Sequence, residues 1–123
     1  MQQKQRPMIK TFDTVNTKPT EKFQNEVLRP VIKLQHVLLW LNFININAKQ
    51  INQLVSLNKE EQLLLIKHLF SKNSTLRNKS IGIVIGCLSR SEYNTYVNHT
   101  KEFDRRIVQM ICQRIADTIP QIN

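Results

Sequence analysis

The sequence predicts an all-α protein, a compact bundle of about five helices with a flexible basic arm at its N-terminus. Residues 27–46 carry apolar side chains at helical spacing. Glycine occurs only 2 times in the 123 residues, which argues against many tight hairpins. Apolar residues make up 41% of the chain, enough for one packed core, and the chain is too short for two ordinary domains.

The chain divides into three expected parts. Residues 1–19 are polar and basic and lack sustained periodicity, so we expect them to form the flexible arm. One helical domain should follow over residues 20–119, with a short tail over residues 120–123. Thr20 is a suitable N-cap for the first helix, and Glu21 in the first turn suits the helix dipole.

Residues 27–46 are predicted to form the central helix of the core, within a helix that runs from Glu21 towards Ile46. An apolar stripe recurs along it every three or four residues, and a second set widens that stripe, so this face should be covered on more than one side. The stripe is Val27, Val31, Leu34, Leu38 and Leu41, and the second set is Leu28, Ile32, Leu39, Phe43 and Ile46. Pro30 lacks an N–H and should kink this helix or split off a short leader.

The middle of the chain predicts a short helical segment and then a longer helix. One or two amphipathic turns are expected over residues 48–56. Asn58 with Glu61 three residues later is a capping box that should begin a helix over 59–71. The expected inward residues of this helix are Leu63, Leu64, Ile66, Leu69 and Phe70.

A β-branched cluster at residues 81–85 has strand propensity. No second strand exists to pair with it, so we predict a helix over residues 74–88 instead. Gly82 and Gly86 would then lie on one face, at a spacing that lets two helices approach closely.

The C-terminal part predicts two helices. Ser89 with Glu92 is a second capping box, and the helix that it begins has Tyr93, Tyr96 and Val97 on one side. Thr100 is expected to cap a final helix over residues 101–118, which Pro120 ends. The expected inward residues of this last helix are Phe103, Ile107, Met110, Ile111 and Ile115.

The chain is strongly basic, with a formal net charge of +9 that is spread along the sequence. This balance favours an anionic partner, such as RNA, DNA or an acidic protein surface. A compositional bias towards Asn, Lys and Ile is the alternative explanation for the lysines, although it does not explain why Asp and Glu are few.

Cys87 and Cys112 lie inside apolar runs, where cysteine behaves as a small buried hydrophobe. The N-terminus lacks the apolar core of a secretory signal, so we expect a cytoplasmic protein with both thiols reduced. The longest apolar run is shorter than the roughly 20 residues that span a bilayer, which predicts no membrane span.

Two stretches resemble a small bacterial family of helical proteins known mainly from Bacteroidetes. The first stretch carries Glu21, Phe23, Gln24, Asn25, Leu28, Arg29, Pro30, Lys33, Leu34 and Gln35. The second carries Arg77, Asn78, Gly86, Glu92, Tyr93, Tyr96, Arg105, Arg106 and Arg114. The resemblance implies a helical fold. Members of that family are often labelled glyoxalase, and the family has no established function.

The residues themselves carry no glyoxalase motif. Metal-dependent glyoxalases use either a strand-rich scaffold with His and Glu ligands or a THxHxDH motif, and neither is present. His36, His68 and His99 are far apart in the sequence, so we expect no metal and no cofactor. A nucleophile elbow and a glycine-rich phosphate loop are also missing, which favours a non-enzymatic protein.

Basic residues are better candidates for a binding site. Arg29, Lys33 and His36 share one helix edge, where His36 would add a switchable positive charge. Trp40 continues this edge by one turn, and cations followed by an aromatic ring suit phosphate contact and base stacking. Further candidates on later helices are Arg77, Lys79, Arg105 and Arg106. Alternatively, these cations form solvated faces and local ion pairs, and Gln24–Asn25 with Arg29 tie down helix ends.

These patterns support three hypotheses about function. The first is a non-enzymatic accessory protein that contacts RNA, the ribosome or DNA through basic helix edges. The second is a protein–protein adaptor or homodimer that uses the apolar central helix, with Trp40 and Phe43 in its interface. The third is a small enzyme of unknown type.

Overall fold

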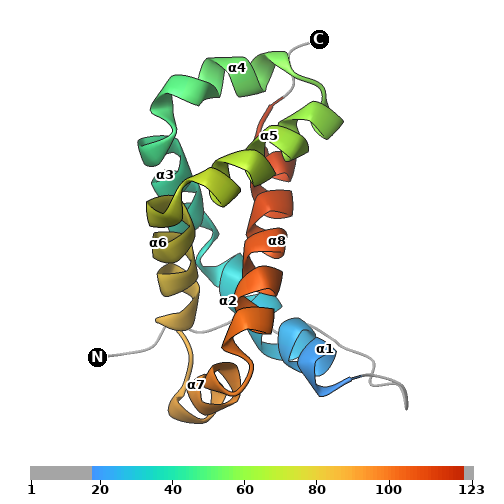
Figure 1. Ribbon diagram of the computed structural model, residues 1–123, viewed down its shortest axis with the longest axis vertical. Helices are drawn as coiled ribbons and strands as arrows, with labels where there is room; N and C mark the ends of the chain where they lie inside the picture. The colour runs from blue at the N-terminus through green and yellow to red at the C-terminus, as the bar shows by residue number, and fades with distance from the viewer. Residues whose placement is uncertain (1–17, 121–123) are drawn as a thin grey trace.

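The computed structural model describes residues 18–120, and every regular element in this range is helical (Figure 1). The elements are α1 (Pro19–Phe23), a π-helical segment (Gln24–Leu28), α2 (Arg29–Leu34), α3 (His36–Ile46), a 3-10 turn (Ala48–Gln50), α4 (Ile51–Ser56), α5 (Lys59–Lys72), α6 (Ser74–Ile85), α7 (Arg90–Val97) and α8 (Thr100–Thr118). The all-α prediction is confirmed. If the continuous run Pro19–Leu34 counts as one helix, the described residues form 7 helices, whereas about five were expected. The predicted arm and tail lie almost wholly outside the described residues.

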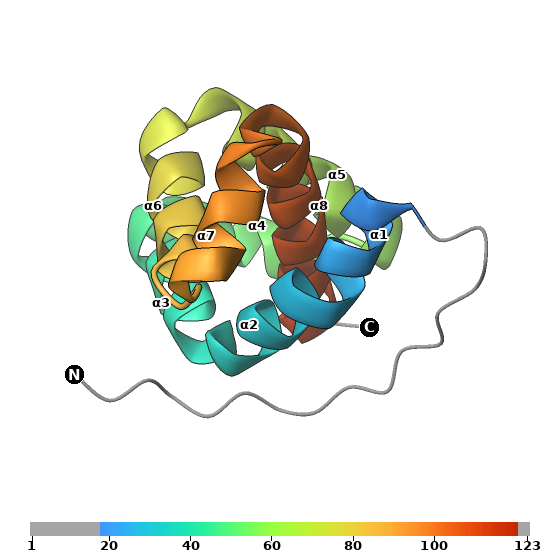
Figure 2. The same ribbon diagram turned by 90° about the horizontal axis from the view of Figure 1, so that it is seen from below.

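The central helix of the fold is α8. It contacts α5, α6, α7, α2 and the π-helical segment, and Figure 2 shows these elements arranged around it. Its buried side chains are Phe103, Ile107, Ile111, Cys112, Ile115 and Ala116. By contrast, α3 packs mainly against α6. The prediction that residues 27–46 form the central helix is therefore wrong, because this segment is divided between two helices at the side of α8.

The chain passes through Pro30 without a break. The turn before it is π-helical, and the N–H of Arg29 bonds to the carbonyl of Gln24, five residues back. This wider turn relieves the clash that a proline ring makes with the preceding turn of an α-helix. The 65° bend comes instead at Gln35, between Pro19–Leu34 and His36–Ile46. The predicted kink at Pro30 is therefore wrong in position.

The buried side chain of Gln35 fixes this bend, because its Nε2 donates to the carbonyl of Ile83 on α6 at 3.2 Å. The second apolar set faces inward on both sides of this bend, since Ile32 is 3% exposed on α2 and Leu39 is 2% exposed on α3. Leu38 and Leu41 of the predicted stripe are 44% and 49% exposed. The stripe therefore faces solvent on α3.

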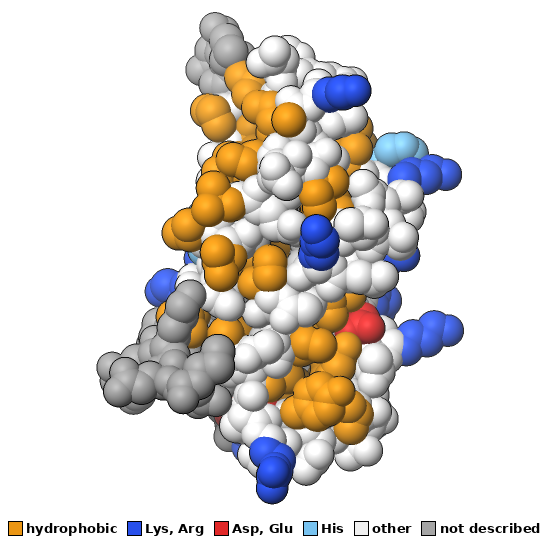
Figure 3. All heavy atoms as spheres, turned by 90° about the vertical axis from the view of Figure 1, so that its left-hand side faces the viewer, with side chains coloured by type: hydrophobic (Ala, Val, Ile, Leu, Met, Phe, Trp, Pro, Cys, Tyr) orange, Lys and Arg blue, Asp and Glu red, His pale blue; other side chains and the backbone are white. Residues whose placement is uncertain are grey.

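Apolar side chains are consequently exposed along α3, where Val37 joins Leu38 and Leu41. Figure 3 shows apolar side chains along the side of the molecule on which α3 and α6 lie. Among the described helices, none alone has the length and apolar character to cross a membrane. Only the bent pair Pro19–Leu34 and His36–Ile46 has both when its two helices are taken together.

Local signals placed most helix starts correctly. Both arms of the predicted capping box at Asn58 and Glu61 are present, and so are both arms of the box at Ser89 and Glu92. The cap predicted at Thr100 is wrong: Thr100 is the first residue of α8, and its hydroxyl donates back to the carbonyl of Val97.

Two expectations about side-chain placement were also wrong. Leu64 was expected inward but is exposed on α5. A Cβ added to Gly82 would meet nothing within 4 Å, so Gly82 does not mediate a close helix contact. At Gly86 the nearest atom to an added Cβ is the carbonyl oxygen of Gly82, at 3.1 Å. This oxygen belongs to the last turn of α6 itself and not to a second helix.

Gly82→Ala should raise the free energy of unfolding by about 1 kcal/mol, because alanine restricts the unfolded chain and this helical site has room for a methyl group. Urea denaturation followed by circular dichroism measures the change. Gly86→Ala is the control and should gain less, since the oxygen at 3.1 Å would have to shift. Loss of stability in Gly82→Ala would show that this glycine has a packing role.

Candidate functional site

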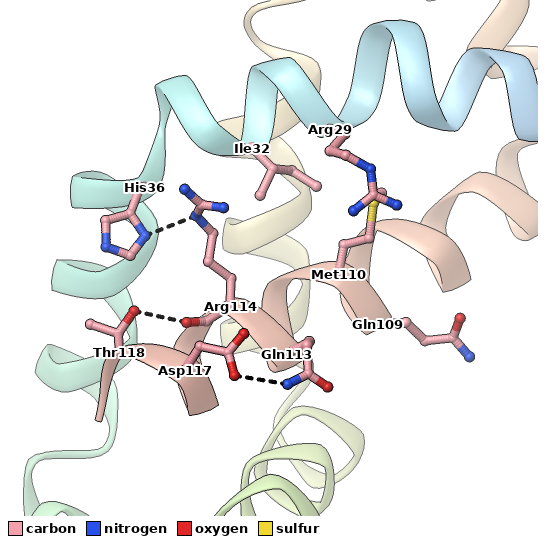
Figure 4. Close-up of a pocket in the computed structure, with 9 residues that line it drawn as sticks. All are labelled: Arg29, Ile32, His36, Gln109, Met110, Gln113, Arg114, Asp117 and Thr118. Atoms are coloured by element: carbon pink, nitrogen blue, oxygen red, sulfur yellow. Dashed lines mark hydrogen bonds between the residues drawn. The ribbon is translucent and has the colours of Figure 1, made fainter. Parts of the chain in front are cut away.

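A groove with a volume of about 630 Å³ lies between the α2–α3 corner and the C-terminal half of α8 (Figure 4). Its lining residues are Arg29, Ile32, His36, Gln109, Met110, Gln113, Arg114, Asp117 and Thr118. The bend at Gln35 lets side chains of both α2 and α3 face α8. The volume lies in the range that small-molecule and cofactor sites occupy.

One long-range hydrogen bond organises the groove. The Nε of Arg114 donates to the Nδ1 of His36 at 3.0 Å. This nitrogen must be deprotonated to accept, so the imidazole is neutral and carries its proton on Nε2. Burial, and then the charge of Arg114, lower the pKa of His36 below its ordinary value of 6.5. The predicted switchable charge is thus absent at neutral pH, and His36 instead orients an arginine.

The cations of the groove have no acid partner within residues 18–120. Arg114 forms no ion pair there, so its two terminal amino groups keep donors available. Arg29 is exposed, and its guanidinium lies beside Met110 in Figure 4, facing α8. A guanidinium donates through a planar fork that matches the oxygens of phosphate or carboxylate. The groove can therefore hold an anion between two helices.

One carboxylate also lines the groove. Asp117 accepts a hydrogen bond from Gln113 Nε2 at 3.0 Å. Figure 4 shows the Arg114 guanidinium directed towards α2 and α3, whereas the Asp117 carboxylate stays beside α8. The half-buried Met110 supplies apolar surface between these polar groups, and the buried Ile32 lies at the floor of the groove. The groove thus offers cationic, acceptor and apolar surfaces to one ligand.

The structure brings together only two of the eight predicted site residues, Arg29 and His36. Lys33 and Lys79 are exposed outside the groove. Trp40 is half-buried and packs on Phe43 with ring centroids 6.3 Å apart. The groove takes Arg29 and His36 from opposite sides of the bend, whereas Lys33 and Trp40, the other two residues of the predicted edge, lie outside it.

Three further predicted cations are held by other protein groups. Arg77 donates to the carbonyls of Phe70 at 2.9 Å and Ser71 at 3.3 Å, at the C-terminal end of α5. Arg105 and Arg106 both donate to Oε1 of Glu102, at 2.8 and 2.7 Å. These bonds hold the pKa of Glu102 below its usual value.

Arg106 also donates to Oε1 of Gln24, which ties α8 to the π-helical segment. These contacts of Arg77 and Arg106 favour the alternative interpretation of the sequence. In that interpretation, Gln24 and the cations secure neighbouring helices and do not bind a ligand.

Sequence reasoning did not select Arg114, Gln113 and Asp117 for the site. Asp117 lies four residues after Gln113 and three after Arg114, and both spacings are sequence signals for neighbours on a helix surface. Nothing in the sequence paired that face with Arg29 and His36, since His36 and Arg114 are 78 residues apart. The site depends on tertiary packing.

Other chemistry has little support in the described range. No group of three or more His, Cys, Asp and Glu side chains there could hold a metal ion. Cys112 is buried in α8, and burial raises its pKa to about 12, which leaves the thiol protonated and unreactive at neutral pH. Cys87 is half-buried at the end of α6.

No family model, curated protein or solved structure matches this chain. The resemblance over the stretches around Glu21–Gln35 and Arg77–Arg114 therefore stays a prediction, and so does the glyoxalase label.

The contact between His36 and Arg114 should make the protein less stable in acid. The folded state disfavours the proton on His36, so the unfolded chain binds more protons as the pH falls from about 6.5 towards the lowered pKa. The free energy of unfolding should therefore keep its full value above about pH 6.5 and should decrease as the pH falls from there towards the lowered pKa.

His36→Gln keeps a hydrogen-bond acceptor but cannot titrate, so its free energy of unfolding should change less between about pH 7.5 and about pH 5.5. Urea denaturation at both pH values measures the difference. An unchanged pH dependence in the variant would show that His36 is not the group responsible.

Proposed function

We propose that this protein is a non-enzymatic binding module for single-stranded nucleic acid, RNA or DNA, and that the groove holds the sugar–phosphate backbone. The observation that carries the proposal is the pair Arg29 and Arg114. Both guanidinium groups face one groove, and neither has an ion-pair partner among the residues described. An arginine without an acid partner binds phosphate without first breaking an internal ion pair.

Two further features support a nucleic acid over a small inorganic anion. The net charge of +9 attracts a polyanion at long range and favours fast association. The half-buried Met110 adds apolar surface beside the cations, where the face of an unstacked base can pack. We also propose that the protein acts in the cytoplasm, where RNA is plentiful.

Fluorescence anisotropy with a labelled single-stranded RNA of about eight nucleotides tests the proposed function. The affinity should fall steeply as salt rises, with a slope of roughly −0.7 in log–log form for each phosphate contacted. Double-stranded DNA of the same length is the comparison and should bind more weakly, because its bases cannot enter the groove. Absent binding, or binding that salt does not weaken, would remove the proposal.

A second candidate function is homodimerisation through the apolar face of α3. Val37, Leu38 and Leu41 are exposed there. No residue of α3 carries a charge while His36 is neutral, so two copies can meet on this face without like-charge contact. We expect sedimentation to give a dimer mass that Leu38→Lys reduces to the monomer mass, and a monomeric wild-type protein would exclude this candidate.

A further inference from the structure

We propose that the groove recognises a base as well as a phosphate, and that Asp117 accepts N–H donors from a guanine of the bound strand. This inference rests on the proposed function and adds the class of nucleotide that the same groove prefers. It comes from the one carboxylate that lines a groove otherwise suited to an anion.

The position of Asp117 is unfavourable for the fold alone. It lies in the last turn of α8, where the partial negative charge of the helix C-terminus repels a carboxylate. No cation pairs with it in the part of the chain that the structure describes, although the protein has an excess of cations. Its hydrogen bond there comes from a neutral amide, that of Gln113. Departures from such local preferences are expected at functional or strained sites.

The nearest cation on the same helix is directed elsewhere. Arg114 precedes Asp117 by three residues, a spacing that allows an ion pair on a helix. The Arg114 side chain instead donates to His36, on another helix, at 3.0 Å. The acceptor and the cation thus remain available to two different groups of one ligand.

The charges of the lining residues match a single nucleotide. With His36 neutral, Arg29, Arg114 and Asp117 leave the groove with one net positive charge, which one phosphodiester neutralises. A purely anionic ligand would leave Asp117 facing a like charge. A nucleotide avoids this, because its phosphate can bind the arginines while its base presents donors to the carboxylate.

The chemistry of Asp117 selects among the bases. An ionised carboxylate only accepts hydrogen bonds, and its two oxygens can accept from two neighbouring donors. The Watson–Crick edge of guanine presents an imino N–H beside an amino group, whereas uracil presents one imino N–H between two carbonyl oxygens. The hydrogen bond from Gln113 holds the carboxylate in place, and Met110 lines the same groove.

Three short RNAs test this inference by anisotropy: an all-uridine strand, the same strand with one central guanosine, and the same strand with inosine there. Inosine lacks the amino group of guanosine. We expect the guanosine strand to bind roughly tenfold more tightly than the all-uridine strand, with inosine between them. Asp117→Asn should bring the three affinities close together, because the amide replaces one acceptor by a donor.

Glu60→Gln is the matched control, since it removes an acidic charge from an exposed position on α5 outside the groove. It should raise all three affinities alike and keep the guanosine preference. Equal affinities that still depend on salt would overturn base recognition and leave the proposed function standing. A guanosine preference that survives Asp117→Asn would also overturn it. If none of the RNAs binds, both the proposed function and this inference fail.

Discussion

Leu39→Ala should lower the free energy of unfolding by about 2–5 kcal/mol, whereas Leu38→Ala should lower it by less than about 1 kcal/mol. The two leucines are neighbours on α3, and their removal deletes the same atoms. Leu39 is 2% exposed and Leu38 is 44% exposed, so only Leu39→Ala leaves a cavity in the core. Urea denaturation of both variants measures the difference.

This pair of variants tests which face of α3 is buried. By helical spacing, Leu38 continues the stripe of Val31 and Leu34, whereas Leu39 continues the second apolar set of Leu28 and Ile32. The structure turns Leu38 towards solvent and buries Leu39 in the core. Equal destabilisation by the two substitutions, or a larger loss in Leu38→Ala, would contradict this orientation of α3, the helix that brings His36 to the groove.

The double variant Arg29→Ala, Arg114→Ala should lower the affinity for single-stranded RNA by at least about a hundredfold, because each charge-assisted hydrogen bond to phosphate contributes roughly 1.5–3 kcal/mol. It should also reduce the salt slope by about 0.7, the value for one phosphate contact on a single strand. Anisotropy at several salt concentrations measures both quantities.

Arg90→Ala provides the control for a general charge effect. Arg90 is exposed at the start of α7 and lies outside the groove. This substitution should change the affinity by only a few-fold and reduce the salt slope much less. If its effect per charge equalled that of the double variant, binding would follow the overall positive charge and not the groove.

Most of the helix starts could be predicted because their signals are local. Asn58 and Glu61 are three residues apart, and a capping box requires only that spacing and suitable side chains. The helical state of residues 81–85 could also be predicted, since a strand there would have had no partner.

The bend at Gln35 could not be predicted in the same way. It depends on a hydrogen bond from Gln35 to the carbonyl of Ile83, 48 residues away, and on burial of the glutamine side chain against α6. Pro30 was the stronger local signal, but a π-helical turn accommodates its ring. Tertiary contacts decided which of the two positions bends the chain.

Composition indicated which residues are cations but not which of them are available. In the sequence, Arg77 and Arg106 resemble Arg29, yet the structure commits Arg77 to backbone carbonyls and Arg106 to Glu102 and Gln24. Arg114 joins the site only through its contact with His36. A binding role therefore depends on the partners that each guanidinium already has, which become visible only in the fold.

The most direct test of the nucleic-acid groove is an NMR titration of the arginine side chains with single-stranded RNA. The Nε–H signals of Arg29 and Arg114 should shift as RNA is added, because both guanidinium groups contact phosphate in the proposed complex. The signal of Arg90 should stay in place. Shifts at Arg90 with Arg29 and Arg114 unchanged would place the nucleic acid elsewhere on the protein and contradict this account.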